Sequence, residues 1–312
     1  MSNELKIFSG SANPGLAAEI AAYLNVQMGR IELGRFPEGE VKVKIGENIR
    51  GTDCFLVQST CPPVNDSLME LLVMIDAFRR ASARRITAVI PFYGYARQDR
   101  KDQPRVPITA KLVANLVTAA GAHRVLTMDL HAMQIQGFFD IPLDHLLAAP
   151  VLIDYFKTLK IPDLMVATAD VGGIKQAWQF AERLRTGLAI VDKKRSGDQD
   201  VKAMALIGDV RGRNVIIPDD MIATAGTLAT AAKFLRENGA KDLYACCTHP
   251  IFSGDAVSRL KGIGFKEIVV TNTIPLPPER QLPEVRTLSI ANLFGEAILR
   301  IHNETSVSSL FA

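Results

Sequence analysis

Short runs of hydrophobic residues recur along the chain and alternate with longer segments in which apolar residues return every three or four positions. The short runs are continuously apolar, which is typical of strands that are covered on both faces of a sheet. They lie at residues 5–8, 54–58, 86–91, 125–128, 164–168, 188–191, 215–218, 243–247 and 268–271. We therefore predict a strand at each of these positions.

The longer segments predict helices between the strands. One helix is expected from about residue 65 to about residue 80. Its apolar residues at helical spacing are Leu68, Leu71, Leu72, Ile75 and Phe78. Asn65 or Asp66 is expected to cap its start. A second helix is expected from about residue 226 to about residue 238, and Gly239 supplies the left-handed residue that ends it. Strands that alternate with helices predict an α/β fold with mostly parallel sheets.

The two halves of the chain share a faint internal repeat. In each half a buried strand, a loop and a helix lead to a Gly-Ala pair and then to another strand. Gly121 precedes His131 by ten residues, and Gly239 precedes His249 by ten residues. The first copy is longer by about nine residues, which fall in the polar stretch 95–105. The repeat favours two related α/β halves. A coincidence is the alternative, because this order of elements is common in α/β proteins.

The length of 312 residues corresponds to about two domains. We place an N-terminal domain at residues 1–148 and a C-terminal domain at residues 149–312, and leave open that the C-terminal helix packs back on the N-terminal domain. Hydrophobic residues make up 48% and charged residues 22%, so the chain can bury a full core.

The net charge of +3 neither demands nor excludes nucleic acid, and small anionic substrates fit it equally well. No apolar stretch reaches the roughly 18 residues of a membrane span, and the N-terminus lacks the pattern of a secretory signal. The four cysteines form no CxxC pair, which favours a reducing compartment. We expect a soluble cytoplasmic protein without a nucleic-acid or membrane partner.

The polar segment after the strand at 215–218 carries the strongest chemical signal. Asp219 and Asp220 are followed by Met-Ile-Ala-Thr-Ala-Gly-Thr and then by a predicted helix. At the carboxyl end of a parallel strand, two adjacent carboxylates can accept hydrogen bonds from the vicinal hydroxyls of a ribose. The backbone N–H groups of the turn and the hydroxyls of Thr224 and Thr227 suit a phosphate monoester. The aspartates could instead only cap the helix, but the complete unit favours a ribose-phosphate site.

Four further segments narrow this interpretation. They read LMELLVMIDAFRRASA at 68–83, VIPFYGYARQDRK at 89–101, DLHAMQIQGFFD at 129–140 and HPIFSG at 249–254. Together with the Asp219 loop, they resemble the ribose-phosphate diphosphokinase family, in its phosphate-regulated class, and the resemblance runs from Ile7 to Phe311.

The resemblance implies a fold and an activity. The fold is two phosphoribosyltransferase-like domains, each a mostly parallel sheet flanked by helices. The activity is transfer of the diphosphoryl group of ATP to the C1 hydroxyl of ribose 5-phosphate, which gives AMP and phosphoribosyl pyrophosphate for nucleotide biosynthesis. Mg²⁺ is the implied cofactor, phosphate and ADP are implied effectors, and the implied assembly is a homo-oligomer, expected to be a hexamer.

The resemblance also assigns roles to residues. Those implied to bind ATP are Arg97 and Gln98 and, across a subunit interface, Phe36, Glu38, Gly39 and Glu40. Those implied to hold magnesium are His131 and Asp170. Those implied to be catalytic, in a loop that closes on the substrates, are Lys193 and Arg195. Those implied to bind ribose 5-phosphate are Arg195, Asp219, Asp220, Ala223, Thr224, Ala225, Gly226 and Thr227. Those implied to form the regulatory site are Gln136, Asp144, Ser306, Ser308 and Phe311.

Four positions depart from the family pattern. Ala223 stands where an aspartate is usual, which leaves open how active the enzyme is. His145 replaces a usual asparagine near the implied regulatory site, and nothing explains Ala169 or Pro218. Two alternatives remain: a non-catalytic regulatory relative that binds nucleotide or partner subunits, and a phosphoribosyltransferase that acts on a base. The retained basic and acidic residues disfavour the first alternative, and the ATP-like segments disfavour the second.

Overall fold

The computed structural model describes residues 4–195 and 201–310, which form two compact units. The first unit comprises Met1–Leu147, Thr273–Pro275 and Ser289–Ala312, and the second comprises Ala148–Asn272 and Leu276–Leu288. In space, residues 289–312 of the expected C-terminal domain therefore belong to the first unit.

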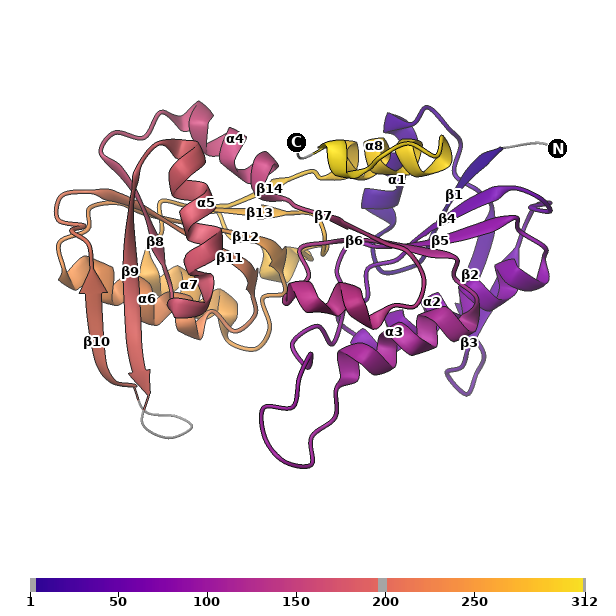
Figure 1. Cartoon of the computed structure of the whole chain (residues 1–312), viewed down its shortest axis with the longest axis horizontal. Helices are drawn as coiled ribbons and strands as arrows, with labels where there is room; N and C mark the ends of the chain where they lie inside the picture. The colour runs from indigo at the N-terminus through magenta and orange to yellow at the C-terminus, as the bar shows by residue number, and fades with distance from the viewer. Residues whose placement is uncertain (1–3, 196–200, 311–312) are drawn as a thin grey trace. The chain divides into compact units, whose positions relative to one another are not determined.

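The first unit is built on a five-stranded parallel sheet with the strand order β1-β4-β5-β6-β7 (Figure 1). Its strands are β1 (Leu5–Ser9), β4 (Asp53–Val57), β5 (Arg85–Ile90), β6 (Arg124–Met128) and β7 (Leu143–Leu146). The three central strands consist almost entirely of buried residues, because helices cover both faces of the sheet.

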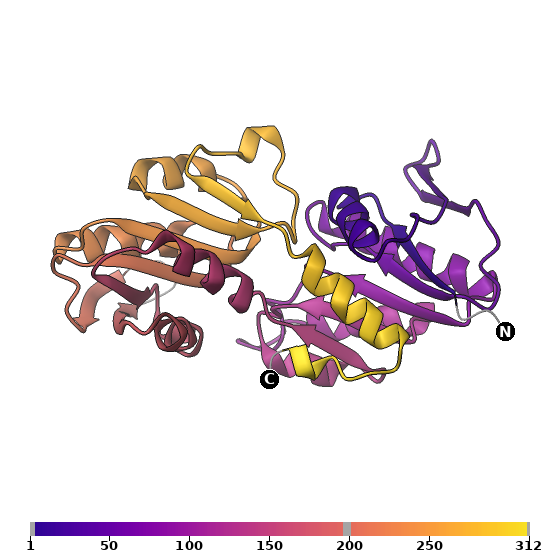
Figure 2. The same ribbon diagram turned by 90° about the horizontal axis from the view of Figure 1, so that it is seen from above.

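The helices of this unit form two layers, one on each face of the sheet (Figure 2). They are α1 (Pro14–Tyr23), α2 (Val64–Arg80), α3 (Thr109–Ala120) and α8 (Ala291–His302). Alternate strand residues such as Phe8, Leu56 and Ala88 share one core cluster with α2 and α3, while α1 and α8 pack together on the opposite face. A separate hairpin of β2 (Ile31–Arg35) and β3 (Val41–Ile45) packs against α2.

The second unit is built on a seven-stranded sheet with the order β10-β9-β8-β11-β12-β13-β14, which is parallel except for the pair β9–β10. Its strands are β8 (Leu164–Thr168), β9 (Gly187–Arg195), β10 (Val201–Ile207), β11 (Asn214–Ile222), β12 (Leu243–Pro250), β13 (Glu267–Thr271) and β14 (Val285–Leu288). Its helices are α4 (Ala149–Leu159), α5 (Ile174–Leu184), α6 (Gly226–Glu237) and α7 (Ala256–Ile263). α6 and α7 share a core cluster with β11 and β12, whereas α4 packs on α5, which contacts β8, β9 and β11.

The predicted fold class is confirmed, since both units are mostly parallel sheets flanked by helices. The nine predicted strands are present within the described residues, and Gly239 follows α6 with a φ of 89°. The predicted cap of α2 is wrong, because Pro63 precedes the helix and no side chain caps it. The nine predicted runs do not include β2, β3, β7, β10 and β14, because the described side chains of these strands form no continuous buried run. Among the described residues, no helix combines the length and apolarity needed to cross a bilayer.

Candidate active site

The predicted ribose-phosphate loop lies at the carboxyl end of β11, in the second unit. β11 extends to Ile222, so Asp219 and Asp220 belong to the strand itself rather than following it. The Oδ1 atoms of Asp219 and Asp220 accept hydrogen bonds from the N–H groups of Asp220 and Met221, at 2.9 and 2.8 Å. The backbone therefore holds both carboxylates at the strand end, where ligands of parallel sheets bind.

The turn after β11 has the backbone shape of an anion-binding loop. Ala225 adopts the left-handed conformation, with a φ of 59°, and α6 begins directly after it. The N–H groups of the first turn of α6 thus lie at the loop, where the helix dipole favours negative charge. The carbonyls of Ile222 and Ala223 accept hydrogen bonds from the N–H groups of Phe252 and Ser253, each at 3.0 Å. The HPIFSG segment therefore braces the loop.

The carboxylates of Asp170, Asp219 and Asp220 lie near one another where β8 and β11 end, because these parallel strands are neighbours in the sheet. Burial raises the pKa of Asp219 well above its usual range, and the charges of Asp220 and Asp170 raise it further. Hydroxyl donors and cations both relieve such repulsion. The cluster is therefore suited to the hydroxyls of a sugar and to a hard cation.

Asp170 is fixed at the start of the short helix η2 (Val171–Gly173). Its Oδ1 atom accepts hydrogen bonds from the N–H groups of Gly172 and Gly173, at 2.9 and 3.2 Å. A carboxylate held in this way is an oxygen ligand of the kind that Mg²⁺ prefers. In the described part of the chain, no three His, Cys, Asp or Glu side chains form a metal cage. A single carboxylate is compatible with a hard divalent cation such as Mg²⁺, which keeps several waters and binds substrate phosphates.

The other predicted group lies in the first unit, at the end of neighbouring strands. Arg97 and Gln98 follow β5, and His131 follows β6, which pairs with β5 in parallel. The three residues line one pocket of about 350 Å³. The other residues that line it are Asp99, Arg100, Asp102, Val106 and Pro107. The structure thus brings two of the predicted ATP contacts, Arg97 and Gln98, together with the predicted magnesium ligand His131.

Gln98 is anchored to the start of α3. Its N–H group donates to the carbonyl of Tyr95 at 3.0 Å, and its carbonyl accepts from the N–H group of Ala110 at 3.1 Å. Its side-chain Oε1 atom accepts a hydrogen bond from the hydroxyl of Thr109. The amide NH₂ group of Gln98 is therefore the end that can donate to a ligand. The sequence analysis missed Thr109, because no pattern of residue types reveals which hydroxyl orients an amide.

The predicted cross-subunit segment forms the tip of the β2–β3 hairpin. The N–H groups of Phe36 and Gly39 donate to the carbonyls of Glu40 and Phe36, each at 2.8 Å, and close a tight turn. The ring of Phe36 is 46% exposed, and the ammonium of Lys42 lies 5.7 Å from its centroid. The ring is thus available for stacking on a base. Phe36, Glu38, Gly39 and Glu40 are not among the residues that line the pocket of about 350 Å³.

The predicted catalytic residues lie on an antiparallel ribbon at the edge of the second sheet. Lys193 and Arg195 occupy the end of β9, which pairs with β10. Their side chains lie outside the described part of the structure, as do residues 196–200. Their catalytic role stays a prediction.

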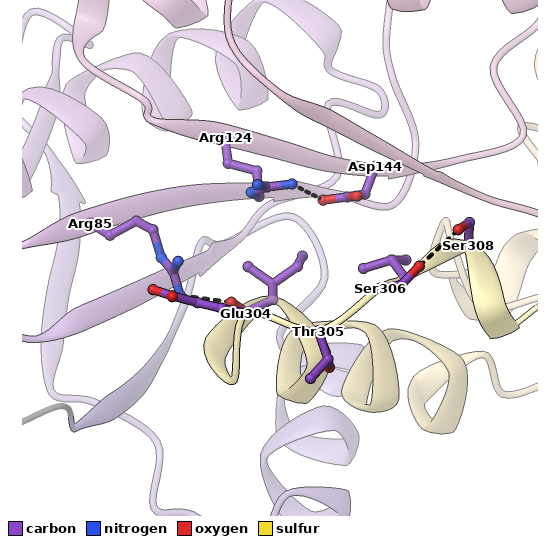
Figure 3. Close-up of a pocket in the computed structure, with 9 residues that line it drawn as sticks. Arg85, Arg124, Asp144, Glu304, Thr305, Ser306 and Ser308 are labelled. Carbon is purple, nitrogen blue, oxygen red and sulfur yellow. Dashed lines mark hydrogen bonds and ion pairs between the residues drawn. The ribbon is translucent and has the colours of Figure 1, made fainter.

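Three predicted regulatory residues line one pocket of the first unit. Asp144 on β7, and Ser306 and Ser308 after α8, border a cavity of about 540 Å³ (Figure 3). The other residues that line it are Arg85, Arg124, Ile301, Glu304, Thr305 and Val307. Gln136 lies instead in the short helix η1 (Met133–Phe138), where its side chain donates to the carbonyl of Met133 at 3.2 Å. Phe311 lies outside the described residues.

The two arginines of this pocket are not in the sequence prediction. Arg124 donates to Asp144 at 2.5 Å (Figure 3), and Arg85 forms an ion pair with Asp53. Each is the first residue of its strand, so the pocket lies at the amino ends of β5 and β6, opposite the Arg97 pocket. A signal was available in the sequence, because a basic residue directly precedes each of the two predicted strands.

The chain is similar to known proteins in both sequence and structure. Residues 5–121 match the N-terminal domain of ribose phosphate pyrophosphokinase, and residues 195–312 match the phosphoribosyl synthetase-associated domain. The chain is 57% identical to a ribose-phosphate pyrophosphokinase of Gloeobacter violaceus, over 98% of this chain and 93% of that protein. It is 56% identical to one of Caldanaerobacter subterraneus subsp. tengcongensis, over 99% of this chain and 98% of that protein.

A solved structure agrees with the sequence matches. The phosphoribosylpyrophosphate synthetase of Mycobacterium smegmatis has a TM-score of 0.91 to this chain at 42% identity, over 96% of this chain and 99% of that one. The resemblance inferred from the motifs is thereby confirmed along nearly the whole sequence. The chain belongs to the ribose-phosphate pyrophosphokinase family.

Proposed function

We propose that this chain is an active ribose-phosphate diphosphokinase, which transfers the diphosphoryl group of ATP to the C1 hydroxyl of ribose 5-phosphate. Its products are phosphoribosyl pyrophosphate and AMP. One observation carries the proposal: in a chain of this family, the complete Asp219–Thr227 loop presents two fixed carboxylates and a helix N-terminus at the end of β11.

Two parts of ribose 5-phosphate, its ring hydroxyls and its phosphate, bind to different groups of the loop. Its ring hydroxyls donate to Asp219 and Asp220, and its phosphate accepts from the backbone of the turn and from the hydroxyls of Thr224 and Thr227. Ala223 contributes no carboxylate, but its backbone is braced like that of its neighbour. The cradle for the phosphate therefore does not depend on a side chain at that position.

ATP is bound by Arg97 and Gln98 of one subunit. The guanidinium of Arg97 suits the phosphate oxygens, and the amide of Gln98 donates from a fixed position. The exposed Phe36 ring of another subunit stacks on the adenine, with Glu38, Gly39 and Glu40 close to it. This arrangement requires a homo-oligomer, which we propose to be a hexamer. Light scattering of the active enzyme tests the assembly, and a stable, active monomer would contradict it.

The reaction forms a bond between the C1 hydroxyl oxygen and the β-phosphorus of ATP. It breaks the bond from that phosphorus to the oxygen shared with the α-phosphate, which leaves with AMP, and the hydroxyl proton passes to solvent. Lys193 and Arg195 neutralise charge on the transferring oxygens, the main source of catalysis in phosphoryl transfer. Mg²⁺ would supply further charge neutralisation, and each unit offers one candidate ligand for it, His131 in the first unit and Asp170 in the second.

Formation of AMP from ATP tests this proposal. We expect AMP to appear only when ribose 5-phosphate and a divalent cation are both present. Absence of turnover at saturating substrates, with ATP still bound, would favour the non-catalytic regulatory relative. A phosphoribosyltransferase would instead form a nucleotide from phosphoribosyl pyrophosphate and a free base, and we expect no such product.

We also infer that the pocket of Asp144, Ser306 and Ser308 binds phosphate or ADP. Hydroxyl donors and the guanidinium of Arg124 suit phosphate oxygens, although Asp144 already engages Arg124 and an anion must compete for it. Inhibition by ADP in the wild type and in the Ser306→Ala, Ser308→Ala double variant tests this role. Equal inhibition of the two proteins would contradict it.

We further propose a cytoplasmic location. The four cysteines are buried and form no disulfide, which fits a reducing compartment. Fractionation of the source cells tests the location.

A further inference from the structure

The HPIFSG segment and the helix after it lie against the phosphate loop, although the proposed chemistry gives them no role. α7 follows this segment, and Arg259 of α7 reaches back to the loop. Its Nη1 atom donates a hydrogen bond of 2.9 Å to the carbonyl of Thr224. Its Nη2 atom lies 3.7 Å from the carboxylate of Asp255, one turn earlier on the chain. The guanidinium is therefore held between its own helix and the loop.

Three successive carbonyls of the loop are held by this one segment. Phe252 donates to Ile222 and Ser253 donates to Ala223, each through the backbone at 3.0 Å, and Arg259 completes the series at Thr224. The first two bonds come from the backbone and survive most substitutions. The third bond depends on the side chain of Arg259, so a substitution at this one position removes it.

The bond to Thr224 sets the direction of the next N–H group. A trans peptide is planar, so its carbonyl and its N–H group point in opposite directions. With the Thr224 carbonyl turned toward Arg259, the N–H group of Ala225 points away from α7. Ala225 itself has a φ of 59°, a left-handed conformation that is unfavourable for an L-residue and persists only when its surroundings enforce it. The hydrogen bond from Arg259 to the Thr224 carbonyl helps to hold Ala225 in this conformation.

The guanidinium also lies close to the start of α6. A Cβ atom built on Gly226 would be 3.6 Å from the Nη1 atom of Arg259. A fixed positive charge at this point adds to the positive end of the α6 dipole. The arginine can thus favour a dianionic phosphate at the loop while its hydrogen bond remains on the backbone.

We propose that Arg259 is a positioning residue for the phosphate of ribose 5-phosphate. It holds the Thr224–Ala225 peptide in the orientation that directs the Ala225 N–H group to the phosphate. The inference rests on the proposed function, because it assumes that this loop binds ribose 5-phosphate. It predicts an effect on binding of that substrate and little effect on ATP or on the rate of transfer.

Kinetics of Arg259→Gln and Arg259→Lys test the proposal, with Arg236→Gln as a matched control. Arg236 of α6 likewise donates to a backbone carbonyl, that of Gly264 at 2.7 Å, but at the other end of the helix pair. We expect Arg259→Gln to raise the KM for ribose 5-phosphate about tenfold or more, with kcat and the KM for ATP within about twofold. Arg259→Lys retains a charge and one donor, so it should recover part of the affinity.

Calorimetric titration with ribose 5-phosphate and with ribose separates positioning of the phosphate from a general loss of structure. Arg259→Gln should weaken binding of ribose 5-phosphate and leave that of ribose unchanged. An unchanged KM in Arg259→Gln, or an equal rise in Arg236→Gln, would overturn the proposal. If Arg259→Gln does not fold, Arg259→Lys decides, since a KM within twofold of the wild type would also overturn it. If the wild type does not bind ribose 5-phosphate, the proposed function fails instead.

Discussion

The Nδ1 atom of His302, the last residue of α8, lies 2.8 Å from the Oδ2 atom of Asp53, the first residue of β4. Asp53 is only 1% exposed and also forms an ion pair with Arg85. Arg85 in turn donates to the carbonyl of Ile301 at 2.9 Å. One buried carboxylate thus fastens the C-terminal helix to the start of two strands of the first sheet.

Asp53→Ala should destabilise the protein by about 2–3 kcal/mol, because it leaves Arg85 partly buried without its partner. Urea unfolding measures the change. Arg80→Ala is the control, since Arg80 pairs with Asp76 on the exposed surface of α2 and its loss should shift the midpoint little. Similar midpoints for Asp53→Ala and the wild type would show that this contact does not hold α8.

Thr109→Val should raise the KM for ATP about fivefold, because it removes the hydroxyl that orients the amide of Gln98. Thr109→Ser keeps the hydroxyl and should stay close to the wild type. Thr118→Val serves as the control, since the hydroxyl of Thr118 donates at 2.9 Å to Ala114 within the same helix. Initial rates at varied ATP give the three values. Equal values for Thr109→Val and Thr118→Val would exclude Thr109 from positioning Gln98.

Asp219→Asn should make the ligand-free protein more stable at neutral and alkaline pH. Burial and two neighbouring carboxylates raise the pKa of Asp219, so the folded chain keeps a proton that the unfolded chain releases above about pH 4. Stability of the wild type therefore falls as the pH rises from about 4 through the raised pKa. Asparagine cannot ionise and avoids this loss, but it replaces one acceptor oxygen with an NH₂ donor and should weaken ribose 5-phosphate binding.

Thermal unfolding at several pH values, without divalent cations, measures the difference between Asp219→Asn and the wild type. It should grow from pH 4 upward. Asp242→Asn is the control of opposite sign, because Lys266 lowers the pKa of Asp242 and that carboxylate stabilises the folded chain when ionised. A difference in stability for Asp219→Asn that is independent of pH would show that the pKa of Asp219 is not raised in the folded protein.

Much of the site follows from the positions at which the strands end, and the sequence pattern predicts those positions. Asp219 and Asp220 end a buried apolar run, so their place at the sheet edge is predictable. Arg97 and His131 follow successive strands of one repeat, and these strands become neighbours. The long loop that carries Arg97 appears in the sequence as the extra residues of the first repeat.

Other parts depend on packing that no local pattern encodes. Ser306 and Asp144 line one pocket only because α8 packs on the first sheet, far along the chain from β7. The contact of Arg259 with Thr224 depends on side-chain orientation, for which residue type is a weak guide. The cap of α2 was expected at a polar residue, but a proline occupies the capping position.

Gly94→Ala should both destabilise the protein and displace the ATP loop. A Cβ atom at Gly94 would lie 2.5 Å from the carbonyl oxygen of Thr60 and 2.8 Å from the side chain of Val64. The N–H group of Gly94 also donates at 2.7 Å to the hydroxyl of Thr60, so the backbone cannot move away without losing this bond. Overpacking of this kind costs about 1–3 kcal/mol.

Because Gly94 lies three residues before Arg97, the displacement should raise the KM for ATP more than that for ribose 5-phosphate. Gly15→Ala in α1 is the control, since a Cβ atom there meets nothing within 4 Å and both KM values should stay unchanged. Urea unfolding and initial rates on the two variants give the comparison. A Gly94→Ala protein with normal stability and normal KM for ATP would show that the loop tolerates the added methyl group, and that the contact with Thr60 does not fix Arg97.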